Sequence, residues 1–161
     1  MKQYMKLGLL PFFFAILLMV ASGCSLQASS EEVAQAKKDF IEIVDQVNVE
    51  APNGIKVLTD VRDMYKKGEV KRTKVQNTIS NGMGINDNIY ADVVSAHIPS
   101  ELEPFRDRLM KALDKRKEGY QALFDAFDKN DPSKEPAADA KIAESIEDLR
   151  KIQKDIDPFR K

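Results

Sequence analysis

The residue types that most often carry out chemistry are scarce in this chain. It has a single Cys, Cys24, and a single His, His97. His97 has no Ser, Cys or Asp at a spacing that forms a catalytic motif, so we expect a histidine at a helix end or on the surface. Because no nucleophile–base pair and no set of metal ligands can be assembled, we predict a protein that is not an enzyme and that holds no metal or cofactor.

An oxygen-rich stretch at residues 125–135 is the nearest approach to a metal site. Its acidic and amide side chains are Asp125, Asp128, Asn130, Asp131 and Glu135. Counted from Asp128, a calcium loop needs an oxygen ligand at the fifth position and Gly at the sixth, where this chain has Pro132 and Ser133. We therefore predict a solvated loop between helices.

The surroundings of Cys24 are more informative. Lys2 and Lys6 give the chain a positive start, and residues 7–22 are an uncharged stretch of 16 residues that ends in small side chains. This stretch is shorter than the ~20 residues that span a bilayer comfortably, and Pro11 would interrupt a spanning helix. A charged start, an apolar run and a small-residue end predict a secretory signal peptide.

The join Ala21-Ser22-Gly23-Cys24 resembles the lipobox of bacterial lipoproteins, whose common form is Leu-(Ala/Ser)-(Gly/Ala)-Cys. The resemblance implies a diacylglycerol attached to the Cys24 sulfur by a thioether and cleavage between Gly23 and Cys24. The resemblance further implies two acyl chains of the palmitate type, which suffice for stable anchoring, and a location at the extracytoplasmic face of the cell membrane. The implied organisation is a signal peptide over residues 1–23, a lipidated tether over 24–30 and a folded domain over 31–161.

The folded domain is predicted to be all-α. Apolar residues recur at steps of three and four along successive segments, which is the pattern of one helix face. Each segment has a single apolar stripe that must be buried against another, and short connections favour antiparallel neighbours. We predict an antiparallel bundle of four to five helices behind the cleaved signal peptide.

Local signals predict where these helices begin and end. Capping boxes are expected at Ser29–Glu32 and at Ser100–Glu103. Helix ends or interruptions are expected at residues 51–54, at Gly68, at residues 81–84 and before Ile98-Pro99, with a loop over residues 130–136. Gly82 and Gly84 follow a helical pattern and not a strand, which predicts a turn rather than a phosphate-binding loop.

Charge is nearly balanced overall, with 25 Lys+Arg against 26 Asp+Glu, and this balance argues against a nucleic-acid partner. Locally it is uneven, because residues 31–50 carry six acids and two bases whereas residues 62–74 carry six bases and two acids. The candidate contacts with an anionic surface are Lys66, Lys67, Lys71, Arg72 and Lys74. The alternative is that the acidic first helix packs beside these residues and cancels their field.

Arg116, Tyr120 and the LFDAF run at residues 123–127 resemble helical wall-associated lipoproteins of Gram-positive bacteria. This resemblance implies no site residue. Together the features predict a membrane-anchored bacterial lipoprotein whose helical domain binds a protein or another envelope component. The alternative is a carrier for a small apolar ligand, held between helices near Tyr90 and Phe124.

Overall fold

The computed structural model describes residues 29–160, and this part of the chain is a bundle of four α-helices without strands. The α-helices are α2 (Ser30–Lys66), α3 (Arg72–Ser95), α4 (Glu103–Asp128) and α5 (Glu135–Ile156). Short 3-10 helices occupy Ser100–Leu102, Pro132–Lys134 and Asp157–Arg160. The predicted all-α bundle is confirmed, whereas the signal peptide, Gly23 and Cys24 lie outside the described residues.

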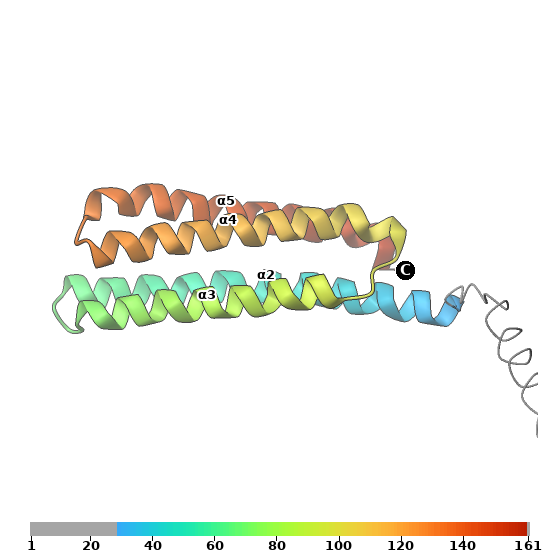
Figure 1. The fold of residues 1–161 in the computed structure, drawn as a ribbon, viewed down its shortest axis with the longest axis horizontal. Helices are drawn as coiled ribbons and strands as arrows, with labels where there is room; N and C mark the ends of the chain where they lie inside the picture. Colours follow the sequence, from blue (N-terminus) through green and yellow to red (C-terminus); the bar gives the residue numbers. More distant parts are fainter. Residues whose placement is uncertain (1–28, 161) are drawn as a thin grey trace, which may run out of the picture.

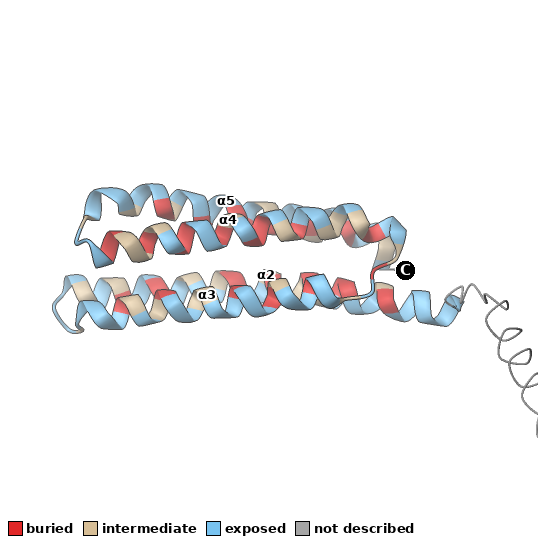
Figure 2. Cartoon of the chain, viewed as in Figure 1, coloured by how far each residue is buried: buried red, intermediate tan, exposed pale blue. Residues whose placement is uncertain are grey.

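The helices run alternately up and down along one long axis (Figure 1). The α2–α3 and α4–α5 connections lie together at one end of the bundle. The start of α2, the α3–α4 connection and the end of the chain lie at the other end. The first turns of α2 extend beyond the other helices, and their side chains are exposed as far as Gln35 (Figures 1 and 2).

The core consists of the inward faces of the four helices (Figure 2) and divides into two clusters. The cluster nearer the start of α2 includes Phe40, Val44, Leu109, Leu113 and Leu149. The cluster nearer the two loops includes Leu58, Val75, Ile79, Tyr120 and Ile142. Their spacing of three and four along each helix follows the helical repeat, so the sequence pattern directly predicts which faces are buried.

Two predicted helix ends are confirmed by their capping geometry. The Ser29 hydroxyl accepts a hydrogen bond from the Glu32 backbone N–H at 3.2 Å, and the Glu32 carboxylate accepts one from the Ser29 N–H at 2.7 Å. At the other end of α2, Gly68 adopts a φ of 76° and its N–H bonds to the Tyr65 carbonyl. The Glu69 N–H bonds to the Met64 carbonyl, which completes a Schellman motif.

The predicted helix end at residues 51–54 is wrong, because α2 continues through Pro52 and Gly54. Pro52 lacks an N–H and would normally end the helix there. Ala51 and Leu58, on either side, are buried against the other helices. The Asn48 amide also donates to the Leu149 carbonyl of α5 at 3.2 Å. Tertiary contacts on both sides of the proline therefore hold α2 together as one helix.

The predicted turn at residues 81–84 is also wrong, since both glycines lie inside α3. Gly82 faces the Tyr120 ring, and a Cβ atom at Gly82 would lie 3.2 Å from Tyr120 Cζ. The glycine thus lets α3 approach α4 closely. Gly84 has no such neighbour.

Smaller corrections concern the start of α4 and α5. Leu102 is the N-cap of α4, so the Ser100–Glu103 pair forms no capping box. Ser100 instead begins a 3-10 helix, Ser100–Leu102, that precedes α4. Helix α5 begins at Glu135, which places Pro136 in its first turn instead of in the loop.

Candidate functional site

The five candidate basic residues form one surface feature, the basic tip, defined as Lys66, Lys67, Lys71, Arg72 and Lys74. All five are exposed, and they surround the α2–α3 connection at one end of the bundle (Figure 1). Lys66 lies 3.9 Å from Asp63 on its own helix. The other four side chains form no ion pair with any residue in the described range.

The expectation that the acidic first helix cancels these charges is wrong for the basic tip. The acidic residues 31–50 and the basic tip lie at opposite ends of α2, because this helix continues past Pro52. Lys66 lies sixteen positions after Glu50, which is roughly 24 Å along a helix. In the acidic segment, Asp45 instead accepts a hydrogen bond from Arg160 near the end of the chain at 2.6 Å.

The basic segment at residues 106–117 is largely paired. Arg108 binds Asp155 at 2.8 Å, Lys115 binds Asp148 at 2.6 Å, and Lys117 binds Asp87 at 2.9 Å. Three of its six bases are therefore paired with α5 or α3, whereas four of the five bases of the basic tip form no ion pair within residues 29–160.

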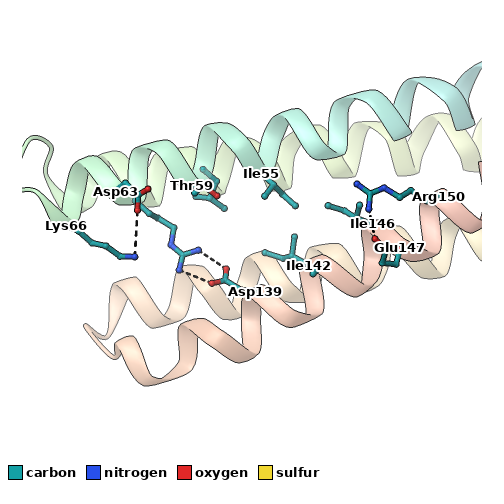
Figure 3. A pocket seen from close by; sticks show the side chains of 12 residues that line it. Ile55, Thr59, Asp63, Lys66, Asp139, Ile142, Ile146, Glu147 and Arg150 are labelled. Carbon is teal, nitrogen blue, oxygen red and sulfur yellow. Dashed lines mark hydrogen bonds and ion pairs between the residues drawn. The ribbon is translucent and has the colours of Figure 1, made fainter.

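A groove of about 520 Å³ lies between α2 and α5 (Figure 3). Its apolar base includes Ile55, Leu58, Ile142 and Ile146. The charged side chains that line it are matched within the groove: Arg62 with Asp139 at 2.7 Å, Lys66 with Asp63 at 3.9 Å, and Arg150 with Glu147 at 2.5 Å. Because each charged side chain that lines the groove already has an ion-pair partner, a charged ligand would have to displace one of these pairs.

Arg62 is the central residue of this matched groove. It bonds to Glu135 at 2.6 Å as well as to Asp139. Burial by itself lowers the pKa of the Arg62 guanidinium, but the hydrogen bonds to Asp139 and Glu135 outweigh burial and raise it. The ion pairs therefore more than compensate for the partial burial of this charge.

A second groove, of about 380 Å³, lies between α2 and α3 and has the opposite character. Two buried residues of α4, Arg116 and Tyr120, form its base, and they are only 3% and 4% exposed. The Arg116 Nε donates a hydrogen bond to Asn86 Oδ1 at 2.7 Å. No ion pair in residues 29–160 involves Arg116, and its terminal nitrogens donate to no other described residue.

In this second groove, burial shifts the pKa values of both Arg116 and Tyr120. Burial lowers the pKa of the Arg116 guanidinium, and it is opposed only by the through-space influence of Tyr120 and Glu50. Burial likewise raises the pKa of the Tyr120 hydroxyl, with Arg116 acting in the other direction. Arg116 is thus a largely buried cation that forms no ion pair with a carboxylate within residues 29–160.

The structure separates the residues proposed for an apolar ligand. Tyr90 packs against the core cluster near the start of α2, whereas Phe124 packs against the cluster near the loops. Phe105 forms an edge-to-face contact with Phe159, their ring centroids 5.4 Å apart. His97 is exposed in the α3–α4 connection, as expected.

Sequence reasoning did not bring Arg116 and Glu50 together in one groove, where the structure places both. The available signal was Arg116 at the i−4 position from Tyr120, within a stretch whose other bases are exposed or half-buried. A helical repeat alone places Arg116 on the buried face between Ala112 and Tyr120. It does not show that α2 and α3 leave a groove above that face.

No protein-family model matches this chain, and no curated protein or solved structure shows a significant match to it. Among helices in residues 29–160, none is both long enough and apolar enough to cross a membrane. Within the same range, no group of three or more His, Cys, Asp and Glu side chains is placed to hold a metal ion.

Proposed function

We propose that this protein is a bacterial lipoprotein, anchored by lipid on Cys24, whose helical domain binds an anionic component of the cell envelope through the basic tip. The observation that carries the proposal is the exposure of that tip, because four of its five bases form no ion pair within residues 29–160. Five bases stand against a single acid, Glu69, over residues 66–74, a local net charge of +4. Opposite charges on an extended polymer would meet several of these side chains at once.

The position of the basic tip supports a partner away from the anchoring membrane. Helix α2 has 37 residues, which correspond to about 55 Å of length. A lipid on Cys24 would precede the start of α2, whereas the basic tip follows its end. A bundle standing upright on its anchor would carry the tip outward from the bilayer, toward a wall polymer.

Binding to purified cell-wall sacculi tests this partner. We expect the full-length protein in a neutral detergent to sediment with sacculi that retain their anionic polymers and to stay in solution when those polymers are removed. Binding should fade with rising salt, since the screening length falls from ~10 Å at 0.1 M to ~3 Å at 1 M. Binding that is indifferent to salt or to polymer removal would refute the proposal.

A matched pair of charge-reversal variants tests the location. Lys67, Lys71 and Lys74 changed together to Glu should abolish the sedimentation. The control changes Lys56, Lys111 and Lys154 to Glu, which are exposed and form no ion pair within the described chain. The control has the same net charge, so equal loss in both variants would show that total charge matters and the basic tip does not.

The anchor is tested separately. Cys24→Ala should remove incorporation of a clickable fatty acid and release the protein from the membrane fraction, because no other Cys is present. Equal labelling of the wild type and the variant would refute lipidation at Cys24.

A further inference from the structure

We propose that the α2–α3 groove is a binding site for a small zwitterion of the apolar amino-acid class, with the ligand carboxylate at Arg116 and its ammonium group at Glu50. This site is independent of the basic tip and of the anchor. It lies in the middle of α2 and uses residues of three helices.

The carboxylate position is assigned by Arg116. An arginine that is 3% exposed is expected to have an anionic partner, because leaving a buried charge unpaired is costly. Only Nε of Arg116 is used within the protein, in the hydrogen bond to Asn86. Its terminal nitrogens remain to donate to a carboxylate in the groove, and the fork of a guanidinium matches the two oxygens of that group.

The ammonium position is assigned by Glu50. This residue lines the same groove and influences Arg116 through space without forming an ion pair with it. Its Oε1 accepts a hydrogen bond from Gln46 at 2.8 Å and its carboxylate is in no ion pair within residues 29–160. A ligand with a negative charge alone would be repelled by Glu50, whereas a zwitterion satisfies both side chains.

The remaining lining suits a compact ligand with an apolar side chain. Ala51, Val57 and Ile85 contribute apolar surface, and Val57 and Ile85 are 55% and 52% exposed. Gly54 on α2 and Gly82 on α3 lie above Tyr120 and leave the groove open. The volume of about 380 Å³ is at the lower end of the range for small-molecule sites.

Calorimetric titration of the full-length protein in neutral detergent tests the ligand class, with leucine as the probe. We expect leucine to bind, and leucine amide and N-acetylleucine each to bind at least tenfold more weakly, since each lacks one of the two charges. Absence of leucine binding would overturn the proposal. Equal binding of leucine amide would also overturn it, because the carboxylate would then not be recognised.

Two variants and a control test the location. Arg116→Met should weaken leucine binding at least tenfold by removing the carboxylate partner. Gly54→Leu should weaken it similarly by placing a side chain over the groove, without altering any charge. Gly84→Leu is the matched control, because no atom lies within 4 Å of a Cβ there and Gly84 does not line the groove.

The outcomes separate cleanly. Gly84→Leu should bind leucine as the wild type does, and thermal melting should confirm that all three variants are folded. Retained binding in folded Gly54→Leu would place the ligand elsewhere and overturn the proposal, even if Arg116→Met proved unstable. Loss of binding in the Gly84→Leu control as well would likewise overturn the assignment to this groove.

Discussion

The two grooves that flank α2 differ in how they treat buried charge. On the α5 side, Arg62 is tied to Asp139 and Glu135, and the other lining charges are matched as well. On the α3 side, Arg116 is more deeply buried and has only the neutral side chain of Asn86 as a hydrogen-bond partner. The lining charges of the first groove therefore pair with one another, whereas Arg116 in the second groove forms no ion pair within residues 29–160.

Groove size does not follow charge pairing in this bundle. The α2–α5 groove is larger, at about 520 Å³ against about 380 Å³. Its lining charges nevertheless satisfy one another, so a ligand there would have to break existing ion pairs. The smaller groove leaves the terminal nitrogens of Arg116 without a protein partner, so a ligand would supply what the fold lacks.

The largest expected effect is on the free energy of unfolding, and it compares how tightly side chains pack at the two grooves. Leu58 at the base of the α2–α5 groove is 4% exposed, and Leu58→Ala should cost about 2–5 kcal/mol in unfolding free energy through the cavity it leaves. Val57, its neighbour on the α3 side, is 55% exposed, and Val57→Ala should change stability by less than about 0.5 kcal/mol. Urea unfolding measures both, and equal costs would contradict the comparison.

The next effect tests the close packing of α4 against α5 at Ile142, a residue that also lines the α2–α5 groove. A Cβ at Gly119 would lie 2.6 Å from Ile142 Cγ1 and 3.1 Å from the Ile142 backbone N. Gly119→Ala should therefore destabilise by about 1–3 kcal/mol, despite the better helix propensity of Ala. Gly84→Ala, in open space, should stabilise by about 0.5–1 kcal/mol. A stabilising Gly119→Ala would show that α4 and α5 are less tightly packed.

A third prediction compares the two arginines directly. Arg62→Met removes the partner of two carboxylates and should cost about 1–2 kcal/mol, between the values for exposed and buried pairs. The double change Arg116→Met with Asn86→Leu replaces an unpaired buried charge and its amide partner by apolar groups. It should be no less stable than the wild type. Arg62→Met should thus lower the melting temperature, whereas the double variant should leave it unchanged or raise it.

The smallest effect is a pH dependence on the α5 side. The hydrogen bond from Arg160 holds the pKa of Asp45 below its ordinary value of 3.8, although burial acts in the opposite direction. Because the folded state lowers this pKa, the stabilisation is present above pH 3.8 and is lost as the pH falls through the lowered value. Asp45 is 39% exposed, so its contribution should stay below about 1 kcal/mol.

Asp45→Asn should therefore lower the melting temperature slightly at about pH 7, and the difference from the wild type should shrink as the pH falls below 3.8. Glu42→Gln is the control, since Glu42 is exposed and forms no ion pair within residues 29–160. An equal effect of both substitutions at neutral pH would show that the Asp45–Arg160 contact does not stabilise the fold.

Local sequence determined the secondary structure and most of the buried faces of this protein. Apolar spacing indicated the helices, the Ser29–Glu32 pair indicated the start of α2, and Gly68 indicated its end. These signals work because helical period, capping and positive φ depend on residues within one or two turns of each other. The same local reasoning failed at Pro52 and at Gly82, where contacts with other helices decide the outcome.

Only the tertiary structure decided which charged side chains form ion pairs. The sequence shows six bases and two acids in each of residues 62–74 and 106–117. Only the packing of α5 and α3 pairs three bases of the second stretch and leaves the basic tip of the first exposed. Only the tertiary structure brings Glu50 and Arg116 to one groove, because they lie 66 positions apart in the chain. Whether a charge is paired depends on its distance to charges on neighbouring helices. The periodicity of one helix carries no information about those distances.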